Sequence, residues 1–594
     1  MFVISPEGFS LDGRPLRVLS GALHYFRVLP EQWPHRLRML RAMGLNTVET
    51  YVPWNLHEPR PGVHDFDGIA DLDRFLHATR TAGLHAIVRP SPYVCAEWEN
   101  GGLPWWLLAD RDVRGLRCQD PAYLDHVDRW MDRLVPVLLP HQVTRGGNVL
   151  MMQVENEYGS YGTDAGYLRH LADGLRARGV DVPLFTSDGP DDFFLTGGAV
   201  PEHLATVNFG SRAKEAFADL RRLRPDDPAM CMEFWCGWFD HWGAEHVVRE
   251  PGDAAGTLAE ILAAGASVNL YMAHGGTNFS TWAGANTKDP ATGAGYLPTV
   301  TSYDYDAPID ERGAATEKFF AFREVLRTYA DGPLPEPEPP AALLPPGRVE
   351  LTERVRLLDP AVLHAVAGDE VRAPLPPSFE ELGIGHGLVL YGSRIPGPRG
   401  KYPLSVQGLG DRAHVFLDGR FAGVLERDAA DGLPDVAVPG GSVDVELLVE
   451  SMGRVNYGAG LGERKGVERV LHTQQLLHGW TARAVELGHG TPERLPWAGG
   501  TAAEGPGPVF LRGFLDVPEP ADAYLALPGL RKGYVWVNGF CLGRYWQERG
   551  PQRTLYLPWP LLRAGRNEIV VLELDGTPDG VEPAVVLCDA PELG

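Results

Sequence analysis

The fold is decided by the stretch Val149-Leu150-Met151-Met152-Gln153-Val154-Glu155-Asn156-Glu157-Tyr158-Gly159-Ser160, in which an apolar run turns abruptly polar and acidic. The run is short and follows Gly146-Gly147-Asn148, which is typical of a fully buried parallel strand. Carboxylates at the end of such a strand either form a solvated rim, as polar residues at strand ends often do, or carry chemistry. The remainder of the chain distinguishes these two interpretations.

Similar apolar runs alternate with helix-like stretches over residues 1–330. The predicted strands are Val18–Leu23, Thr47–Tyr51, His85–Arg89, Val149–Val154, Leu184–Ser187, Ala205–Asn208, Ala229–Glu233 and Val268–Tyr271. The predicted helices are Glu31–Met43, Ala70–Ala82, Pro121–Leu139, Tyr167–Arg178, Ser211–Leu223, Ala254–Ala264 and Ala314–Ala330. Eight alternating units predict a closed (β/α)8 TIM barrel with parallel strands. An open doubly wound sheet is the alternative, but the glycine-rich turn usual after its first strand is missing from the sequence.

The composition changes after residue 330, where a proline-rich stretch at 331–347 predicts a stiff linker. Two hairpin signatures follow, Val415–Gly423 around Asp418-Gly419 and Val535–Arg544 around Asn538-Gly539. Their similarity predicts two all-β jelly-roll or sandwich domains, at 380–485 and 486–594. The segment 348–379 can join either domain. Such domains bind carbohydrate in some proteins, but structural support for the barrel is the favoured interpretation here.

Composition excludes several classes of function. The 594 residues carry a net charge of −24, which argues against binding nucleic acid. The six cysteines are scattered, so neither a disulfide framework nor a metal site is expected. The N-terminus lacks the pattern of a signal peptide, and no apolar stretch is long enough to cross a membrane. We therefore expect a cytoplasmic protein that needs no cofactor and does not bind membranes.

Two of the predicted strand ends carry the strongest functional signal. Asn156 and Glu157 follow the fourth strand, and Glu233 ends the seventh, nearly across the rim of a barrel. Long carboxylate side chains at these places can reach one bound sugar from opposite sides. Glycoside hydrolysis requires such a pair, one acid to protonate the leaving oxygen and one carboxylate to attack the anomeric carbon. Aromatic residues, which stack on the apolar faces of sugars, are dense in the same strand ends and loops.

The chain resembles glycoside hydrolase family 35, the β-galactosidases, and its departures resemble a bacterial branch of that family. The matching motifs are 21–27, 49–58, 89–98, 101–104, 153–161, 233–243, 275–279 and 301–308, in order along the barrel. The two β domains also look like those of the family. Trp235, where many members have Tyr, and the following Cys236-Gly237-Trp238 are the departures that indicate the bacterial branch.

The resemblance implies a role for each matching residue. Glu157 corresponds to the acid/base, Glu233 to the nucleophile and Asn156 to the amide that binds the sugar 2-hydroxyl, whereas Glu155 is structural or pairs with an arginine of the barrel. The positions that match galactose contacts are Tyr51, Cys95, Ala96, Glu97, Tyr271 and Tyr305. Trp235 and Trp238, with Tyr457 reaching in from the first β domain, are predicted to form a platform for a β-1,3-linked N-acetylhexosamine.

These observations predict a retaining exo-β-galactosidase that acts on β-galactoside oligosaccharides. Three alternatives stay open: an exo-β-glycosidase for another β-hexose such as glucosamine, a non-catalytic carbohydrate-binding protein, and a transglycosylase that shares the covalent intermediate. The habit of the family also suggests a homodimer.

Overall fold

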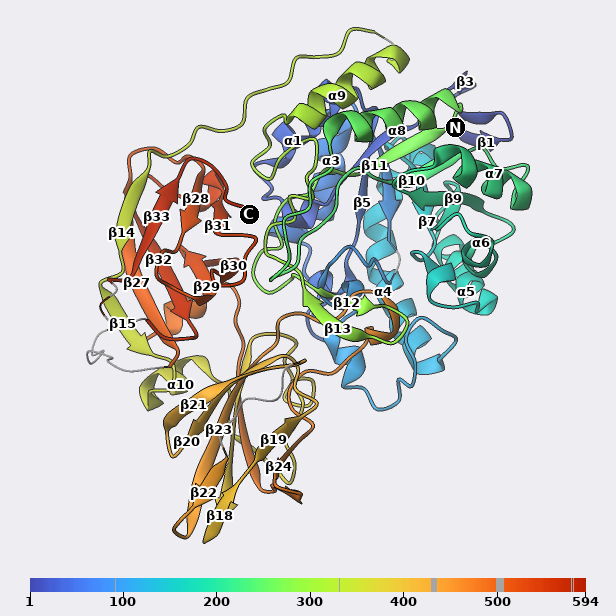
Figure 1. The fold of residues 1–594 in the computed structure, drawn as a ribbon. Coiled ribbons are helices and arrows are strands. Elements are labelled where there is room, and N and C mark those ends of the chain that lie inside the picture. The colour runs from blue at the N-terminus through green and yellow to red at the C-terminus, as the bar shows by residue number, and fades with distance from the viewer. Residues whose placement is uncertain (91, 331, 429–434, 498–506, 578–579, 581) are drawn as a thin grey trace.

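The computed structural model describes residues 1–90, 92–330, 332–428, 435–497, 507–577, 580 and 582–594. Within these residues the chain forms a closed barrel of eight parallel strands, followed by two all-β domains (Figure 1). The predicted fold class is confirmed. Some predicted features include residues outside this description: Ser91 in the motif at 89–98, residue 331 at the start of the linker, residues 429–434 of the first predicted β domain, and residues 498–506, 578–579 and 581 of the second. Among the described residues, no helix combines the length and apolar character needed to cross a membrane.

The barrel strands agree with the predicted ones to within three residues at each end. They are β4 (Leu19–Leu23), β5 (Thr47–Tyr51), β6 (His85–Arg89), β7 (Val149–Gln153), β8 (Leu184–Asp188), β9 (Leu204–Phe209), β10 (Met230–Trp235) and β11 (Ser267–His274). Nearly all of their residues are buried, because side chains fill the barrel on one face and helices cover the other.

Helices surround the barrel in Figure 1. They are α1 (Trp33–Met43), α2 (Trp54–His57), α3 (Leu72–Thr81), α4 (Pro121–Leu138), α5 (Ala165–Ala177), α6 (Asp192–Gly198), α7 (Ala213–Leu223), α8 (Pro251–Ala263) and α9 (Glu317–Leu326). The start of α4 follows from its sequence, because the Asp120 side chain accepts a hydrogen bond from the backbone N–H of Tyr123 at 2.9 Å. The last helix is shorter than predicted, since Thr316 caps it and a 3-10 turn replaces its end.

Some α-helices and strands of the barrel domain have no counterpart in the sequence prediction. They are α2, α6, the N-terminal sheet of β1 (Phe2–Ser5), β2 (Gly8–Leu11) and β3 (Arg14–Pro15), and the hairpin of β12 (Ala285–Asp289) and β13 (Ala294–Pro298). Phe2 and Phe9 of the N-terminal sheet share a core with Ile87, Leu150 and Met151. The sheet therefore packs against the barrel's interior residues.

The first β domain is inserted into the second. Residues 347–356 form β14 (Gly347–Glu350) and β15 (Glu353–Arg356), which pair with strands near the C-terminus, whereas β16 (Val371–Ala373) pairs with β26 (Trp480–Val485). The segment 348–379 thus joins both domains rather than one, with α10 (Pro360–Val366) between its strands. The first β domain also contains β17 (Leu388–Pro396), β18 (Arg399–Tyr402), β19 (Leu404–Gln407), β20 (Arg412–Leu417), β21 (Arg420–Glu426), β22 (Val436–Val438), β23 (Ser442–Glu450), β24 (Arg469–His472) and β25 (Gln475–Leu476). The second is completed by β27 (Val509–Val517), β28 (Ala523–Ala526), β29 (Lys532–Val537), β30 (Phe540–Trp546), β31 (Thr554–Leu557), β32 (Gly565–Glu573) and β33 (Ala584–Cys588).

The two predicted hairpins are confirmed, one in each β domain. Strands β20 and β21 turn at Asp418-Gly419, and β29 and β30 turn at Asn538-Gly539. Asp418 and Asn538 have φ angles of 46° and 48°, the left-handed conformation that this kind of turn requires. Both pairings also shift register within the first strand, so the repeated signature folds into the same local structure.

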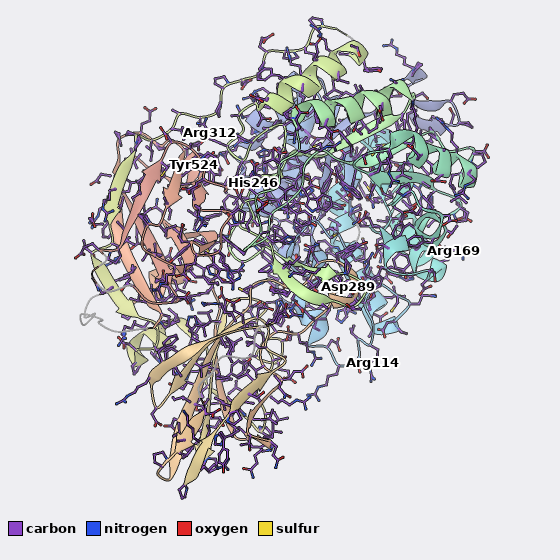
Figure 2. All side chains as sticks on the ribbon, viewed as in Figure 1. Arg114, Arg169, His246, Asp289, Arg312 and Tyr524 are labelled. Atoms are coloured by element: carbon purple, nitrogen blue, oxygen red, sulfur yellow. The ribbon has the colours of Figure 1, made fainter. Side chains whose placement is uncertain are left out.

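The second β domain lies against the barrel. The amide of Gln32 donates to the Tyr556 hydroxyl at 2.8 Å, and the Thr301 hydroxyl donates to the Arg544 carbonyl at 2.6 Å. Figure 2 shows Tyr524 of β28 beside Arg312 at this interface between the two domains. Burial raises the pKa of Tyr524, while the charge of Arg312 acts in the opposite direction. This interface therefore supports the loops after β4 and β11, which carry Gln32 and Thr301, from outside the barrel.

Candidate active site

A cavity of about 210 Å³, open to solvent, lies at the carboxyl ends of the barrel strands. It is lined by Tyr51, Cys95, Ala96, Glu97, Asn156, Glu157, Glu233, Trp235, Trp238, Phe239, Tyr271, Asn286, Tyr305 and Tyr457. The structure thus brings together all of the residues that the sequence predicted for the site. Phe239 and Asn286 are the additions.

Glu233 lies near the end of β10, where a register shift interrupts the pairing with both neighbouring strands. Its carboxylate is held from three directions. The Arg89 guanidinium lies 2.7 Å from Oε1, the Tyr51 hydroxyl donates to Oε1 at 2.8 Å, and the Trp235 indole N–H donates to Oε2 at 3.2 Å. A cation and two hydrogen-bond donors therefore hold this carboxylate in place.

Glu157 has a different environment. It follows β7 in a left-handed backbone conformation, with φ 48° and ψ 39°. Burial, reinforced by the negative charge of Glu233, raises the pKa of Glu157 to about 8. The Asn208 amide donates to Glu157 Oε1 at 2.9 Å and acts in the opposite direction. One carboxyl of the pair is therefore set up to hold a proton while the other is paired with a cation.

Arg89 contacts several polar side chains at the bottom of the site. In addition to Glu233, it contacts Asn156 Oδ1 at 2.5 Å and lies 3.9 Å from Glu49 Oε1. Burial raises the pKa of Glu49 to about 7, with Arg89 acting against the rise. The Asn156 oxygen also accepts from Gln153 at 3.2 Å and faces the Tyr51 hydroxyl at 3.0 Å. Since its oxygen is engaged by protein donors, the amide nitrogen of Asn156 is the atom suited to bind a ligand hydroxyl.

The loop after β6 brings Cys95, Ala96 and Glu97 to the cavity. All three have positive φ angles, of 57°, 56° and 50°, a conformation that non-glycine residues rarely adopt. The Tyr303 hydroxyl hydrogen-bonds the Glu97 carboxyl. Burial raises the pKa of Glu97 to about 7, and this hydrogen bond lowers it in part. Arg27, which donates to the Ala96 carbonyl at 2.5 Å, supports the loop from below.

Tyr271 on β11 and Tyr305 in the loop beyond it form the wall next to Glu97. Their rings meet edge to face with centroids 5.5 Å apart, and the Tyr271 and Tyr303 hydroxyls lie 3.4 Å apart. Arg27 stacks over the Tyr303 ring at 3.8 Å. A carboxyl and several phenol hydroxyls in one wall suit the recognition of a ligand rich in hydroxyl groups.

Aromatic rings line the outer part of the cavity. Trp235 and Trp238 meet edge to face at 5.6 Å, and Trp238 stacks on Phe239 at 4.9 Å. Trp238 is 39% exposed, which is unusual for so large an apolar side chain. These rings provide an open apolar surface next to Glu233.

The first β domain completes the cavity with the segment after β23. Tyr457 lines it, and the backbone carbonyl of Asn456 accepts from the Tyr93 hydroxyl at 2.7 Å. Turned to satisfy its hydrogen bonds, the Asn456 side-chain oxygen accepts from the Glu97 N–H at 3.1 Å and its nitrogen donates to Asn286 Oδ1 at 3.0 Å. Burial raises the pKa of Tyr457 to about 12.

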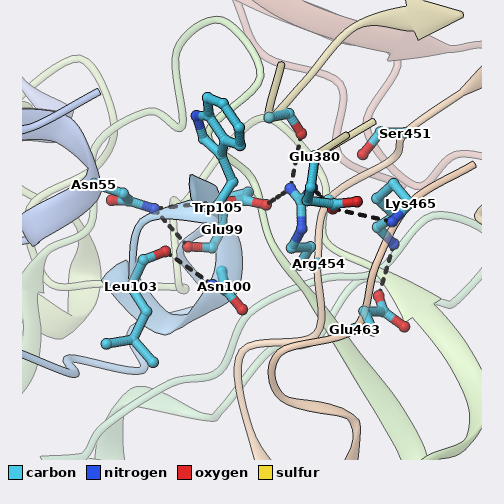
Figure 3. A network of polar contacts seen from close by, with 12 residues as sticks. Asn55, Glu99, Asn100, Leu103, Trp105, Glu380, Ser451, Arg454, Glu463 and Lys465 are labelled. Carbon is cyan, nitrogen blue, oxygen red and sulfur yellow. Dashed lines mark hydrogen bonds and ion pairs between the residues drawn. The ribbon is translucent and has the colours of Figure 1, made fainter. Parts of the chain in front are cut away.

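Arg454 holds this segment against the barrel. Figure 3 shows its guanidinium between Glu99 of the barrel and Glu380 of the first β domain. It also donates to the Gly385 carbonyl at 2.7 Å, and all three charged side chains are buried. Glu380 in turn accepts from the backbone N–H of Lys465 at 3.1 Å. The network joins one end of the segment that carries Tyr457, at Arg454, to both domains, and the other end, at Lys465, to the first β domain.

Glu155 points away from the cavity. Its carboxylate accepts two hydrogen bonds from Arg117, at 2.9 and 2.8 Å, and a third from Tyr167 at 3.0 Å. Arg117 also donates to the Asn156 carbonyl at 2.8 Å. This pair therefore braces the turn that presents Asn156 and Glu157, as expected for a structural glutamate paired with an arginine.

Sequence reasoning did not single out Arg89, Asn208, Phe239 or Asn286. Arg89 and Asn208 end predicted strands, as Glu233 does, so their position on the rim was available as a signal. Asn286 lies on the unpredicted β12–β13 hairpin and had none. Among the described residues, one trio has the spacing of metal ligands, Asp73, His77 and His141, and none of the three lines the cavity.

The barrel and both β domains match known families. Residues 8–329 match the family described as glycosyl hydrolases family 35. Residues 376–486 match the first all-beta domain of beta-galactosidase, and residues 508–567 match the galactose-binding domain of beta-galactosidase.

Mammalian relatives align along nearly the whole chain. The beta-galactosidase of Macaca fascicularis is 40% identical over 99% of this chain and 89% of its own length. The Homo sapiens beta-galactosidase is 40% identical over 99% and 90%. A beta-galactosidase-1-like protein of Mus musculus is 40% identical over 100% and 92%.

Proposed function

The chain belongs to glycosyl hydrolases family 35 and is a β-galactosidase, and from this premise we propose that it removes terminal β-D-galactose from oligosaccharides as a retaining exo-enzyme. Similarity to β-galactosidases over nearly the whole chain disfavours the two alternatives of another β-hexose and a non-catalytic protein. The observation that carries the mechanism is the contrast between the two carboxyls of the cavity, one held by Arg89 and the other with a raised pKa.

The proposed mechanism has two steps. Glu233 attacks the anomeric carbon while Glu157 gives its proton to the leaving oxygen, whose bond to the sugar breaks. A β-galactosyl unit is thereby converted to a covalent ester on Glu233. The ionised Glu157 then takes a proton from water, and the water oxygen attacks the anomeric carbon. The bond from that carbon to Glu233 breaks, the carboxylate is restored, and galactose leaves with its configuration retained. In this proposal Asn156 binds the 2-hydroxyl, and Tyr51, Cys95, Ala96, Glu97, Tyr271 and Tyr305 contact the remainder of galactose.

Two measurements test the mechanism. Glu233→Gln is expected to abolish turnover of a nitrophenyl β-galactoside, and undiminished activity would refute Glu233 as the nucleophile. NMR of the first-formed sugar is expected to show the β anomer, whereas an initial α anomer would refute retention.

A competing sugar acceptor, supplied during the same reaction, separates hydrolysis from transglycosylation, because transglycosylation yields a galactosylated acceptor in place of free galactose.

We further propose a preference for β-1,3 linkages to N-acetylhexosamine. The open surface of Trp235 and Trp238 beside Glu233, with Tyr457 contributed by the first β domain, supports a flat aglycone sugar stacked outside the cavity. Values of kcat/KM on β-1,3, β-1,4 and β-1,6 galactosides test it, and a clear β-1,4 preference would contradict it.

The branch of the family, the cellular location and the oligomeric state are also proposals. Trp235 and Cys236-Gly237-Trp238 support a place in a bacterial branch of the family, which a sequence tree of the barrel domains tests. Six free cysteines support a reducing, cytoplasmic location, which cell fractionation tests. The family resemblance supports a homodimer, and a monomer in light scattering would contradict it.

A further inference from the structure

Behind Glu157 lies a pair of side chains that the proposed mechanism does not use. The Asn208 amide nitrogen, at the end of β9, lies 2.9 Å from Glu157 Oε1, and the Ser187 hydroxyl on β8 donates to Asn208 Oδ1 at 2.6 Å. Both residues are buried. The backbone carbonyl of Ser187 also accepts from the Glu157 N–H at 3.1 Å. Glu157 is thus tied to Ser187 both through its backbone and through Asn208.

The backbone register places Asn208 between the two carboxyls. Asn208 is paired with Glu233 in the parallel pairing of β9 and β10, so the two side chains leave neighbouring strands at the same level of the barrel. In the structure the Ser187 hydroxyl donates to Oδ1, and Nδ2 is left toward Glu157. A buried amide held in this orientation has only its N–H to offer the acid/base.

We propose that Asn208, oriented by Ser187, is a positioning residue that engages Glu157 Oε1, so that Oε2 carries the transferable proton. This inference rests on Glu157 being the acid/base. A donor at Oε1 disfavours a proton there, since two hydrogens would then face each other. In the first step the Oε2–H bond breaks, its proton goes to the glycosidic oxygen, and the electron pair of the broken C–O bond stays on that oxygen. The hydrogen bond from Asn208 then stabilises the carboxylate that is left.

The dependence of the rate on the leaving group separates this role from a merely structural one. Methyl β-galactoside needs protonation of its leaving oxygen, whereas 2,4-dinitrophenyl β-galactoside has a leaving group that departs without it. Asn208→Leu keeps the size of the side chain and removes its donor. We expect kcat/KM for the methyl galactoside to fall about 10- to 100-fold, the value of one hydrogen bond to a charged group. For the dinitrophenyl galactoside we expect less than about a 3-fold fall, since acid assistance is not needed.

Ser187→Ala is a second variant that leaves the donor in place but frees the amide to rotate. It is expected to lower kcat/KM for the methyl galactoside alone, by less than Asn208→Leu does. Thr206→Val is the matched control, because Thr206 is also buried on β9 and its hydroxyl donates to the Thr186 carbonyl rather than to the acid/base. It should show no dependence on the leaving group.

The alkaline limb of kcat/KM gives an independent readout. Burial and the charges of Glu233 and Asp188 raise the pKa of Glu157, whereas Asn208 and Arg89 lower it. Removing the Asn208 donor should therefore move the alkaline limb to higher pH. Tyr457, Tyr93 and Cys95 also interact electrostatically with Glu157 and are unchanged in these variants.

The outcomes distinguish this inference from the function on which it rests. Glu157→Ala should show the same leaving-group pattern more strongly, and without that pattern the assignment of Glu157 as the acid fails. Suppose that Glu157→Ala shows the pattern, but that Asn208→Leu lowers kcat/KM equally for both galactosides or lowers it for neither. Asn208 is then structural and the inference is wrong. Ser187→Ala decides the question if Asn208→Leu does not fold.

Discussion

At the scale of single residues, the site separates two glutamates by their surroundings. Glu233 lies against the Arg89 guanidinium and accepts from Tyr51 and Trp235, whereas Glu157 is half-buried and accepts from the Asn208 amide. Two identical side chains therefore have different surroundings, one beside a cation and the other with its pKa raised to about 8 by burial. The separation depends on Arg89, which contacts Glu233, Asn156 and Glu49 together.

The raised pKa of Glu157 predicts how activity falls at high pH. The proton that leaves with the aglycone must be present, so kcat/KM should decline as pH rises through about 8, the pKa to which burial raises Glu157. For a methyl galactoside this limb should be present in the native chain and absent in Glu157→Gln, whose rate should also be much lower. A dinitrophenyl galactoside, which needs no acid, should lack the limb in both proteins. A full pH profile of kcat/KM on both substrates checks this, and an unchanged limb in the variant would contradict it.

Glu49 predicts a pH dependence of stability. Burial raises its pKa from 4.5 to about 7, so the folded protein keeps a proton that the unfolded chain has lost between these values. Its contribution to the free energy of unfolding therefore falls as pH rises from about 4.5 to 7, by on the order of 3 kcal/mol. Glu49→Gln should be relatively more stable at pH 8 than at pH 5, compared with the native chain. Urea unfolding at both pH values measures this difference.

At the scale of elements, the loops after the barrel strands contain residues whose backbone conformations cost energy. Residues 95–97 after β6, Glu155 and Glu157 after β7, and Tyr305 and Asp306 after β11 all have positive φ angles. Such backbone costs about 1–2 kcal/mol for each non-glycine residue and persists only where contacts enforce it. Contacts such as Arg117 with Glu155 and Arg27 with the Ala96 carbonyl supply that enforcement.

Gly237 shows how closely two of these loops approach. A Cβ atom at Gly237 would lie 1.9 Å from the Tyr305 carbonyl oxygen, so Gly237→Ala should displace Tyr305 and lower kcat/KM by at least about tenfold. Gly256→Ala is the matched control, because nothing lies within 4 Å of its added Cβ on α8. It should keep full activity and gain up to about 1 kcal/mol of stability, since alanine favours helix. Equal activities of the two variants would contradict the prediction.

At the scale of the whole molecule, the active site belongs to two domains. The barrel supplies the carboxyls, and the first β domain supplies Tyr457 and the Asn456 contacts to Glu97 and Asn286. Arg454 joins Glu99 to Glu380 across the boundary between them. The segment that carries Tyr457 is held at both ends, because Arg454 and the Lys465 N–H both bond to Glu380.

Arg454→Met tests this coupling. It leaves two buried carboxylates without their partner, which should cost about 3–5 kcal/mol of unfolding free energy and lower kcat/KM on a disaccharide. Arg60→Met is the matched control, since Arg60 pairs with Glu486 at 2.9 Å across the same two domains but with both side chains 50% exposed. It should cost no more than about 1 kcal/mol and leave kcat/KM unchanged. Similar losses in both variants would show that Arg454 has no special role.

The sequence by itself determined the barrel, its eight strands and the carboxylates on its rim. Local patterns sufficed because a buried parallel strand must be apolar and its carboxyl end must face the site. Glu157 and Glu233 are in that position, and the family motifs assigned their roles. The repeated Asp-Gly and Asn-Gly turns likewise specified both hairpins, since a left-handed turn restricts which residues can form it.

Only the tertiary structure decided which groups meet. Asn208 and Ser187 stand at strand ends like many others, and nothing in their local sequence shows that they reach Glu157. The left-handed conformations of residues 95–97 are imposed by contacts from Arg27 and Tyr303, which are distant along the chain. The place of Tyr457 in the cavity depends on the Arg454 network. These features follow from long-range contacts, whereas strand and turn patterns follow from neighbouring residues.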